Sequence, residues 1–524
     1  MYMIPYFLEN EAKKLLKFKL SKIVNNITDS LINNIFNCNP DNKYQDLILS
    51  LDDNIRKSIL NILKEVFSIF DSLYLNSQER KKYFNISNPR CHRSIFTIFG
   101  LLEFDRVYYY DKSDKNKHFY FVDSLFHLPA YDRYDKVVKG IAINNALSTN
   151  QKKGAEITNN QINSTLSYLE NNTKCNITRQ DIYLWIDKWN IPEIEYESIE
   201  TDDDILYIMI DEKYIHEQLK AIIENNCTNT TKNIDTKNNF DIKNDILGFI
   251  NTLNNPPLLL PAPKQKNKHF IMSKAFITFT GIETKNKRRI LQNKMTFLTT
   301  SKSPWDEFMN SISKIYDFKQ YKTIKVLSDA GTWITSGISN LKLYVDNIVI
   351  PCLCEFHCKQ KINRITKDEL LRKLLNEAID NDDKETFNQL IKITLKDKSE
   401  KRQKVIKNYK HYIIIHWDAI KEMKKSRYKS SMESHISHCV AKYFSFEPKA
   451  YSKRHIQKLI KLQEYKINGI NILGLYLKTS DYKEKKTIKK EEITFSIFER
   501  NSSNIPLLYN NDSLTRLALR KLSA

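Results

Sequence analysis

The N-terminal part of the chain carries apolar side chains at helical spacing. Leu60, Leu63, Phe67 and Phe70 follow one another in steps of three and four residues, which places them on one face of a helix. The pattern predicts a helical region over residues 1–90.

After residue 90 the spacing changes to strict alternation. Apolar and polar residues alternate over 93–99 and again over 103–110, with Gly100 between them, and a third apolar run covers 118–122. Alternation places every second side chain on one face of a strand, and glycine favours the turn that joins two strands. The pattern predicts a small antiparallel β unit over residues 91–130.

Helical spacing returns over residues 131–195. Thr178 precedes a predicted helix that has Arg179 and Gln180 in its first turn and Ile182 on its apolar face. In a helix-turn-helix, the first residues of the second helix contact base edges in the major groove. Arg179 and Gln180 are therefore DNA-binding candidates, and an ordinary helical hairpin is the alternative interpretation.

Residues 200–350 alternate between apolar strands and helices, which predicts an α/β region. The continuous apolar run 205–210 predicts a buried strand that ends at Asp211, and the run 324–327 predicts another that ends just before Asp329. Further strands are predicted over 270–279, 289–291, 295–298 and 347–350. Residues 224–268 are rich in Asn, Thr, Lys and Asp, which predicts an exposed, low-complexity insertion because such a segment buries little apolar surface.

The remaining chain is mainly helical in pattern. Amphipathic stripes, such as the leucines between residues 370 and 375, predict packed helices over residues 351–430. A further helical segment is expected over 431–480. A basic tail follows over 481–524.

Composition adds a candidate partner. The 524 residues include 83 Lys and Arg against 62 Asp and Glu, a formal charge of +21. Such an excess attracts polyanions, nucleic acids first among them. The 41% hydrophobic content is too high for a disordered basic tail protein. Because Asn, Ile and Lys are abundant, an AT-rich genome accounts for part of the charge.

The sequence also suggests a compartment. The start of the chain lacks a basic segment followed by an apolar one, and no apolar run reaches the length of roughly 18 residues that a spanning helix needs. The eight cysteines are scattered along a long chain, unlike the framework of a small secreted domain. We expect a cytoplasmic protein without a membrane partner.

Asp211 and Asp329 are the first candidates for chemistry. Ligands collect at the carboxyl ends of strands in open α/β sheets, and converging carboxylates there hold divalent cations such as Mg²⁺. Two such ions assist phosphodiester transfer, and a third acid normally completes the site. The alternative is that each aspartate only caps the element that follows.

Four segments around these acids resemble one family in order along the chain. They are 210–215 (IDEKYI), 327–334 (LSDAGTWI), 355–361 (EFHCKQK) and 432–438 (MESHISH). They are similar to the motifs of the ISLre2-type transposases, the UPF0236 family, and the likeness extends over about residues 90–455. It is greatest for the divergent branch found on integrative and conjugative elements of AT-rich bacteria.

The resemblance implies an α/β protein with an RNase H-like catalytic core and a helical insertion, preceded by a helical N-terminal region and a small antiparallel sheet. In the family's motifs the DDE triad falls on Asp211, Asp329 and Glu433. The core would then occupy 200–350 and 431–480, on either side of the insertion. Glu355, only 26 residues after Asp329, is the alternative third acid.

The same resemblance implies a function. A DDE-type transposase or recombinase cuts the ends of a mobile DNA element and joins them to target DNA, using two Mg²⁺ or Mn²⁺ ions held by the triad. Its partners would be double-stranded DNA, as terminal inverted repeats and as target, and further copies of the chain on that DNA. The alternatives are an inactive DNA-binding accessory protein and a Mg²⁺-dependent RNase H-like nuclease that does not transpose.

Two other residue groups are candidates near the triad. Cys352, Cys354, His357 and Cys358 have the residue types of a zinc site but lack a second, separated ligand pair. The histidines His357, His435 and His438 are candidates for active-site support, and satisfied core or surface histidines are the alternative. Basic residues on either side of Glu433 are candidates for binding DNA phosphates; they are Lys424, Lys425, Arg427, Lys453 and Arg454.

Overall fold

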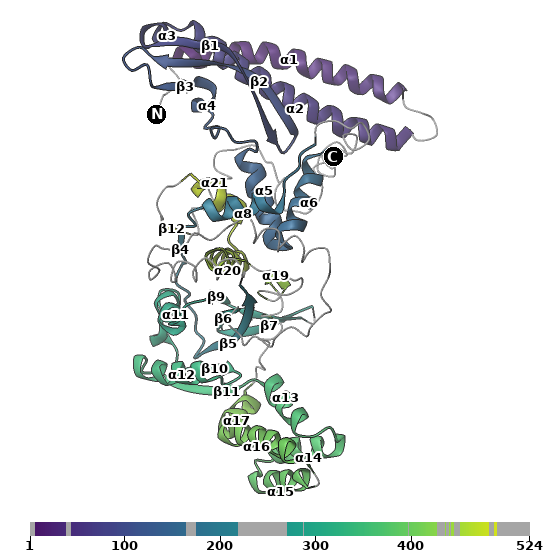
Figure 1. The fold of residues 1–524 in the computed structure, drawn as a ribbon, viewed down its shortest axis with the longest axis vertical. Helices are drawn as coiled ribbons and strands as arrows, with labels where there is room; N and C mark the ends of the chain where they lie inside the picture. Colours follow the sequence, from purple (N-terminus) through teal and green to yellow (C-terminus); the bar gives the residue numbers. More distant parts are fainter. Residues whose placement is uncertain are drawn as a thin grey trace, which may run out of the picture. The chain divides into compact units, whose positions relative to one another are not determined.

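The chain folds into two compact units in the computed structural model (Figure 1). Unit 1 comprises Met1–Glu195 and Ile470–Ala524, and unit 2 comprises Tyr196–Gly469. The structure describes residues 6–37, 43–163, 174–217, 270–286, 288–396, 398–426, 435, 440, 442–444, 451–481 and 487–489. The expected insertion at 224–268 and most of the expected basic tail lie outside the described residues.

Unit 1 begins with a helical hairpin followed by a small sheet. The helices are α1 (Tyr6–Asn37), α2 (Lys43–Asn76) and α3 (Gln78–Tyr83), and the strands are β1 (Phe84–Thr97), β2 (Gly100–Asp111) and β3 (His118–Tyr120). All pairs are antiparallel in the order β1-β2-β3, so the predicted small antiparallel sheet is confirmed. The third strand is shorter than predicted because Phe121 and Val122 are buried as the start of α4 (Phe121–Leu125), where Phe121 stacks on Tyr74 of α2.

A buried carboxyl group joins α2 to this sheet. Asp71 accepts a hydrogen bond from the backbone N–H of Val107 at 2.8 Å and is only 6% exposed. Burial raises the pKa of Asp71 to about 6, against an ordinary value of 3.8. The folded protein therefore holds this proton more tightly than the unfolded chain does, so the contribution of Asp71 to stability falls as the pH rises from about 4 to about 6.

Replacing this carboxyl should remove that pH dependence. We compare the free energy of unfolding of Asp71→Asn with that of the parent at each pH. We expect the difference to increase in favour of the variant by up to about 3 kcal/mol between pH 4 and pH 7, the equivalent of a two-unit pKa shift. Amide hydrogen exchange of β1 and β2 in the full chain measures it. Asp105→Asn is the matched control. Hydrogen bonds from Arg90 and His92 lower the pKa of Asp105, so the stability of this variant relative to the parent should change with pH in the opposite direction. A relative stability of Asp71→Asn that does not change with pH would contradict the assignment.

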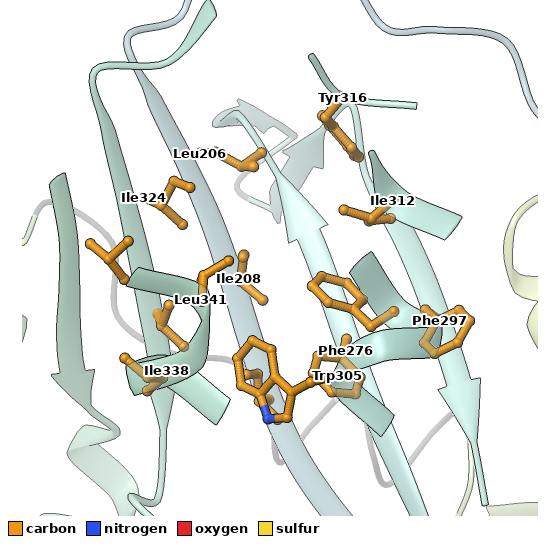
Figure 2. Close-up of a cluster of buried hydrophobic side chains, with 14 of the residues drawn as sticks. Leu206, Ile208, Phe276, Phe297, Trp305, Ile312, Tyr316, Ile324, Ile338 and Leu341 are labelled. Atoms are coloured by element: carbon orange, nitrogen blue, oxygen red, sulfur yellow. The ribbon is translucent and has the colours of Figure 1, made fainter. Parts of the chain in front are cut away.

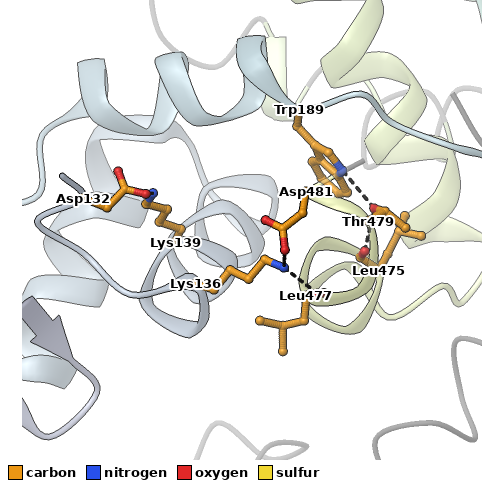
Figure 3. Close-up of polar contacts among 8 residues, drawn as sticks. All are labelled: Asp132, Lys136, Lys139, Trp189, Leu475, Leu477, Thr479 and Asp481. Atoms are coloured by element: carbon orange, nitrogen blue, oxygen red, sulfur yellow. Dashed lines mark hydrogen bonds and ion pairs between the residues drawn. The ribbon is translucent and has the colours of Figure 1, made fainter. Parts of the chain in front are cut away.

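The rest of unit 1 is a helical group that includes a returning C-terminal segment. It contains α5 (Lys136–Ser148), α6 (Gln151–Ile162), α8 (Arg179–Lys188) and α21 (Ile472–Thr479), and β4 (Glu193–Glu195) pairs in parallel with β12 (Thr487–Lys489). Lys136 of α5 donates to the carbonyl of Leu477 at 3.1 Å, and Trp189 donates to the hydroxyl of Thr479 at 3.0 Å. Figure 3 shows both contacts. The chain therefore leaves unit 2 at Gly469. The segment 431–480, which we expect to form the last part of the catalytic core, thus belongs only partly to unit 2.

Unit 2 is built on a mixed five-stranded sheet with the order β11-β10-β5-β6-β9. The strands are β5 (Ile205–His216), β6 (Phe270–Phe279), β9 (Met295–Thr299), β10 (Thr323–Ser328) and β11 (Ile348–Leu353). β5, β10 and β11 are parallel to one another, whereas β5, β6 and β9 form antiparallel pairs. A separate hairpin, β7 (Gly281–Lys285) with β8 (Arg288–Gln292), lies between β6 and β9 in the chain. The α/β class is confirmed.

One face of the sheet carries the main apolar core of unit 2. Alternate residues of β5, among them Leu206 and Ile208, pack against α11 (Pro304–Ile312) and α12 (Thr332–Tyr344). Figure 2 shows Trp305 of α11 next to Phe276 of β6 in this core. The helix α20 (Lys453–Ile467) covers β9, the edge strand at one end of the sheet. There Glu464 of α20 accepts from the N–H of Leu298 at 2.8 Å. Side chains of α20 thus satisfy backbone groups that an edge strand leaves unpaired.

The expected helical insertion has a core of its own. Its helices are α13 (Glu355–Ile365), α14 (Glu369–Asp380), α15 (Lys384–Leu395), α16 (Glu400–Ile415) and α17 (Trp417–Lys425). Ile362, Leu375, Phe387, Ile406 and Trp417 are among its buried residues. α17 also contacts β11, so the insertion is attached to the parallel side of the sheet.

Candidate active site

Asp211 lies within β5, not at its end. The predicted strand end at Asp211 is wrong, because β5 continues to His216 while paired with β6. The parallel pairing of β5 with β10 does stop nearby, with Leu327 opposite Met209. Asp211, only 7% exposed, therefore lies just beyond the point where the parallel part of the sheet ends.

Asp329 directly follows β10 at the same level. It lies two residues beyond Leu327, as Asp211 lies two residues beyond Met209, so the register brings the two aspartates to the same edge of adjacent parallel strands. Alternation places Asp211 on the sheet face opposite Leu206, Ile208 and Ile210, which belong to the α11–α12 core.

The turn after Asp329 orients its carboxylate. Asp329 Oδ1 accepts from the N–H of Gly331 at 3.0 Å, and the Ser328 hydroxyl oxygen accepts from the N–H of Ala330 at 3.1 Å. Ala330 has φ of 57°, a left-handed conformation that costs a non-glycine residue on the order of 1 kcal/mol. The turn leads into α12, which begins at Thr332.

A tyrosine of the helical insertion supports this turn. The hydroxyl of Tyr412 in α16 donates to the carbonyl of Asp329 at 2.5 Å. Burial, with the charge of Asp329 second, raises the pKa of Tyr412, so this hydroxyl remains a hydrogen-bond donor at neutral pH. The insertion and the sheet therefore meet at a candidate catalytic residue.

Removing this hydroxyl should loosen the turn. We expect Tyr412→Phe to lower the opening free energy of residues 329–334 by about 1 kcal/mol, since a partly buried carbonyl loses its donor. Hydrogen exchange of that peptide measures the change. Tyr409→Phe on the same helix, whose hydroxyl accepts from Arg364 at an exposed site, should have less effect; equal effects of the two variants would remove the special role of Tyr412.

The third acid is not determined by the described residues. Glu433 lies outside them, as do His438 and Arg427. The alternative, Glu355, begins α13 just after β11 and forms an ion pair with Lys359 at 2.6 Å. Because Leu353 of β11 pairs with Ser328, Glu355 lies at the same edge of the sheet as Asp329.

The histidine candidates are only partly described. His357 lies in the first turn of α13 and is partly buried. His435 is partly buried as well. Their support of the active site stays a prediction.

The cysteine group does not form a metal site within the described residues. Cys352, Cys354 and Cys358 are buried, and burial raises the pKa of Cys352 and of Cys358 to about 11. Thiols of high pKa are poor metal ligands, because the thiolate is the form that binds. Over the described ranges, no three His, Cys, Asp or Glu side chains are grouped so as to hold a metal ion.

Sequence reasoning missed a polar cluster around Glu212. The indole N–H of Trp333 donates to the Glu212 carboxylate, and the Tyr214 hydroxyl donates to it at 3.2 Å. Lys274 lies 5.5 Å from the centre of the Trp333 ring, and burial lowers the pKa of Lys274. Trp333 thus connects the first turn of α12 to β5. Side chains alternate along a strand, so Glu212 faces the side of β5 opposite to Asp211. This alternation could have predicted that Glu212 belongs to a different cluster.

The DNA-binding candidates in unit 1 are exposed. Arg179 and Gln180 occupy the first turn of α8, after a capping box in which Thr178 and Asp181 bond each other's backbone N–H groups. α8 contacts both α5 and α6. Asn159 of α6 binds both the N–H and the carbonyl of Ile177, at 2.8 and 2.9 Å, which holds the segment before α8 against α6.

The basic candidates in unit 2 have different surroundings. Lys424 forms an ion pair with Asp380, and Lys425 forms one with Glu422 at 3.0 Å. Lys453 and Arg454 are exposed in the first turn of α20. Sequence reasoning did not anticipate that carboxylates accompany Lys424 and Lys425, because the acidic partner of Lys424 comes from another helix.

Over the same described residues, no helix is both long and apolar enough to cross a bilayer. The sequence places the 83 Lys and Arg residues in both units.

Comparison with known proteins shows the family. The model of the "Uncharacterised protein family (UPF0236)" matches residues 42–231 and 260–479. A UPF0236 protein of Caldanaerobacter subterraneus subsp. tengcongensis is 23% identical over 436 residues, covering 80% of this chain and 77% of the relative. A second from the same strain is 23% identical over 433 residues, covering 80% of this chain and 78% of the relative. The chain belongs to the UPF0236 family.

Proposed function

We propose that this protein is a DDE-type transposase that cuts and joins DNA with the help of divalent cations. The observation that carries the proposal is the position of Asp211 and Asp329, each two residues beyond the last parallel pair, Met209 with Leu327, at the same edge of the sheet. Two further parallel strands lie on one side of β5 and an antiparallel meander on the other, the arrangement that would be expected if the core were RNase H-like. The strand order therefore supports the same proposal.

The donor set suits a hard cation. Asp211 and Asp329 offer carboxylate oxygens, the ligands that Mg²⁺ and Mn²⁺ prefer. Glu433 would supply the third acid; Glu355, its alternative, is not grouped with the two aspartates so as to hold a metal ion in the described part of the chain. When bound, two such ions activate an attacking oxygen and stabilise a leaving one. The chain's own contribution is orientation, in which the Gly331 N–H and the Tyr412 hydroxyl hold the side chain and the carbonyl of Asp329.

The names of relatives give independent support. One relative's name joins eleven locus designations of a single strain, and two others join four and two. Many copies of one protein within one genome are what transposition produces. A scaffold protein or a housekeeping nuclease has no need of so many copies.

The decisive experiment is a strand-transfer assay with the full chain and DNA carrying the element's own ends. We expect cutting at the ends and joining to a target plasmid with Mg²⁺ or Mn²⁺, and neither reaction in EDTA. Salt-dependent DNA binding without any cutting would favour the accessory protein. Cutting without preference for element ends and without joining would favour the nuclease.

A further inference from the structure

An open cavity of about 800 Å³ lies within the helical insertion, where the ends of α13 and α15 face α16. Its lining includes five cationic side chains and one carboxylate, Asp368, a balance of 5 − 1 = +4. The cations are Arg364, Lys367, Lys396, Lys398 and Arg402.

No carboxylate neutralises this charge among the described residues. Asp368 is engaged in capping α14, since its Oδ1 accepts from the N–H of Leu371 at 3.1 Å. Arg402 donates to the carbonyls of Arg364 and Ile365, at 2.6 and 3.0 Å, and so binds the end of α13. The described ion pairs of the insertion involve other cations, at Lys359, Lys421, Lys424 and Lys425.

Three of the cations remain for a ligand. Lys367, Lys396 and Lys398 are exposed at the cavity, and they come from two separate segments. Concave surfaces of one charge focus the electric field and concentrate polyanions. A cavity of this volume exceeds the size of one phosphate group and is within the range of ligand sites.

An aromatic and basic surface connects the cavity with the candidate active site. Tyr409 lines the cavity, and Lys361 lies 5.8 Å from its ring centre and 4.9 Å from that of Tyr412. Tyr412 donates to the carbonyl of Asp329. Cations between aromatic rings are typical of surfaces that follow a nucleic-acid backbone.

We propose that this cavity binds the phosphodiester backbone of the DNA whose cleaved end lies at Asp329. The inference rests on the proposed function, and it assigns to the helical insertion the task of holding the substrate. Lys367, Lys396 and Lys398 contact successive phosphates, while Arg364 and Arg402 maintain the shape and charge of the cavity.

The test compares two triple variants of the full chain that lose the same charge. Lys367→Ala/Lys396→Ala/Lys398→Ala alters the cavity, whereas Lys14→Ala/Lys17→Ala/Lys22→Ala alters exposed positions of α1. Fluorescence anisotropy with a labelled duplex, in EDTA and between 50 and 250 mM KCl, gives the slope of log affinity against log salt. We expect the cavity variant to lose about 2 to 3 units of slope, close to 0.9 per phosphate contact, and the α1 variant to stay near the parent.

Two other results would contradict DNA binding by the cavity. Equal slopes for the two variants would overturn the proposal. So would a cavity variant that binds duplex normally but no longer binds inorganic phosphate or ATP in calorimetry, since the cavity would then hold a small anion. The anisotropy measurement requires no DNA cleavage. It therefore supports or rejects DNA binding by the cavity whatever the strand-transfer assay shows. If the slope falls as expected while the parent joins no DNA, the transposase proposal fails alone.

Discussion

Asp329→Asn is expected to lower Mg²⁺-dependent cleavage of element-end DNA on the order of 10³-fold or more, with DNA affinity nearly unchanged. The amide keeps an oxygen that accepts from the Gly331 N–H, so the turn retains its shape. It loses the negative charge that a hard cation needs. Asp211→Asn should have the same effect, because Asp211 lies at the same level on the neighbouring strand.

The measurement is end cleavage with a fixed concentration of labelled duplex, together with binding in EDTA. Asp346→Asn is the matched control, since Asp346 is exposed in the same unit, between α12 and β11. Cleavage by Asp329→Asn at the parent's rate would remove Asp329 from the active site.

The same assay decides between the two candidates for the third acid. We expect Glu433→Gln to match Asp329→Asn. Glu355→Gln should retain most activity, because its described role is a partly exposed ion pair with Lys359, and such pairs contribute little to stability. Loss of cleavage in Glu355→Gln, with cleavage retained in Glu433→Gln, would assign the third acid to Glu355.

Phe276→Ala is expected to lower the free energy of unfolding of unit 2 by about 3 to 5 kcal/mol. Phe276 is fully buried at the centre of β6, with its ring stacked on Phe308 at 4.3 Å and edge-on to Trp305 at 5.3 Å. Truncation removes these ring contacts and leaves a cavity between the sheet and α11 (Figure 2).

Urea unfolding followed by hydrogen exchange of β5 and β6 measures this loss. Phe270→Ala on the same strand is the matched control, because Phe270 is 38% exposed and should cost much less. Similar losses for the two variants would mean that the core between the sheet and α11 does not stabilise unit 2 as described.

Local sequence pattern predicted several elements closely. The run 270–279 is β6 to the residue, and 324–327 lies within β10. Both are apolar enough to be buried in any sheet, so the pattern alone sufficed. Amphipathic stripes, such as the one that begins at Leu370, likewise predicted packed helices within 351–430, where the structure has α13 to α17, because an amphipathic helix needs only one apolar face.

Partners distant in the chain explain the failures. An apolar run ends at Ile210, yet β5 continues to His216 because β6 supplies hydrogen bonds to its polar residues. Cys352, Cys354 and Cys358 have the residue type of a zinc site but are buried, in β11, at the start of α13 and within α13. Lys424 stays a predicted phosphate contact, and the packing of α14 against α17 brings Asp380 to it, which the local sequence does not indicate.

The sequence by itself determined the family, the excess of positive charge and the α/β class, and it nominated the two aspartates as candidates, since each of these depends on residue type and short-range order. Only the tertiary structure decided that Asp211 and Asp329 are level, because register is set by strand pairing between segments more than a hundred residues apart. It alone also joined Tyr412 to the Asp329 turn and gathered uncompensated cations around one cavity. Such contacts arise from packing, which local sequence does not encode.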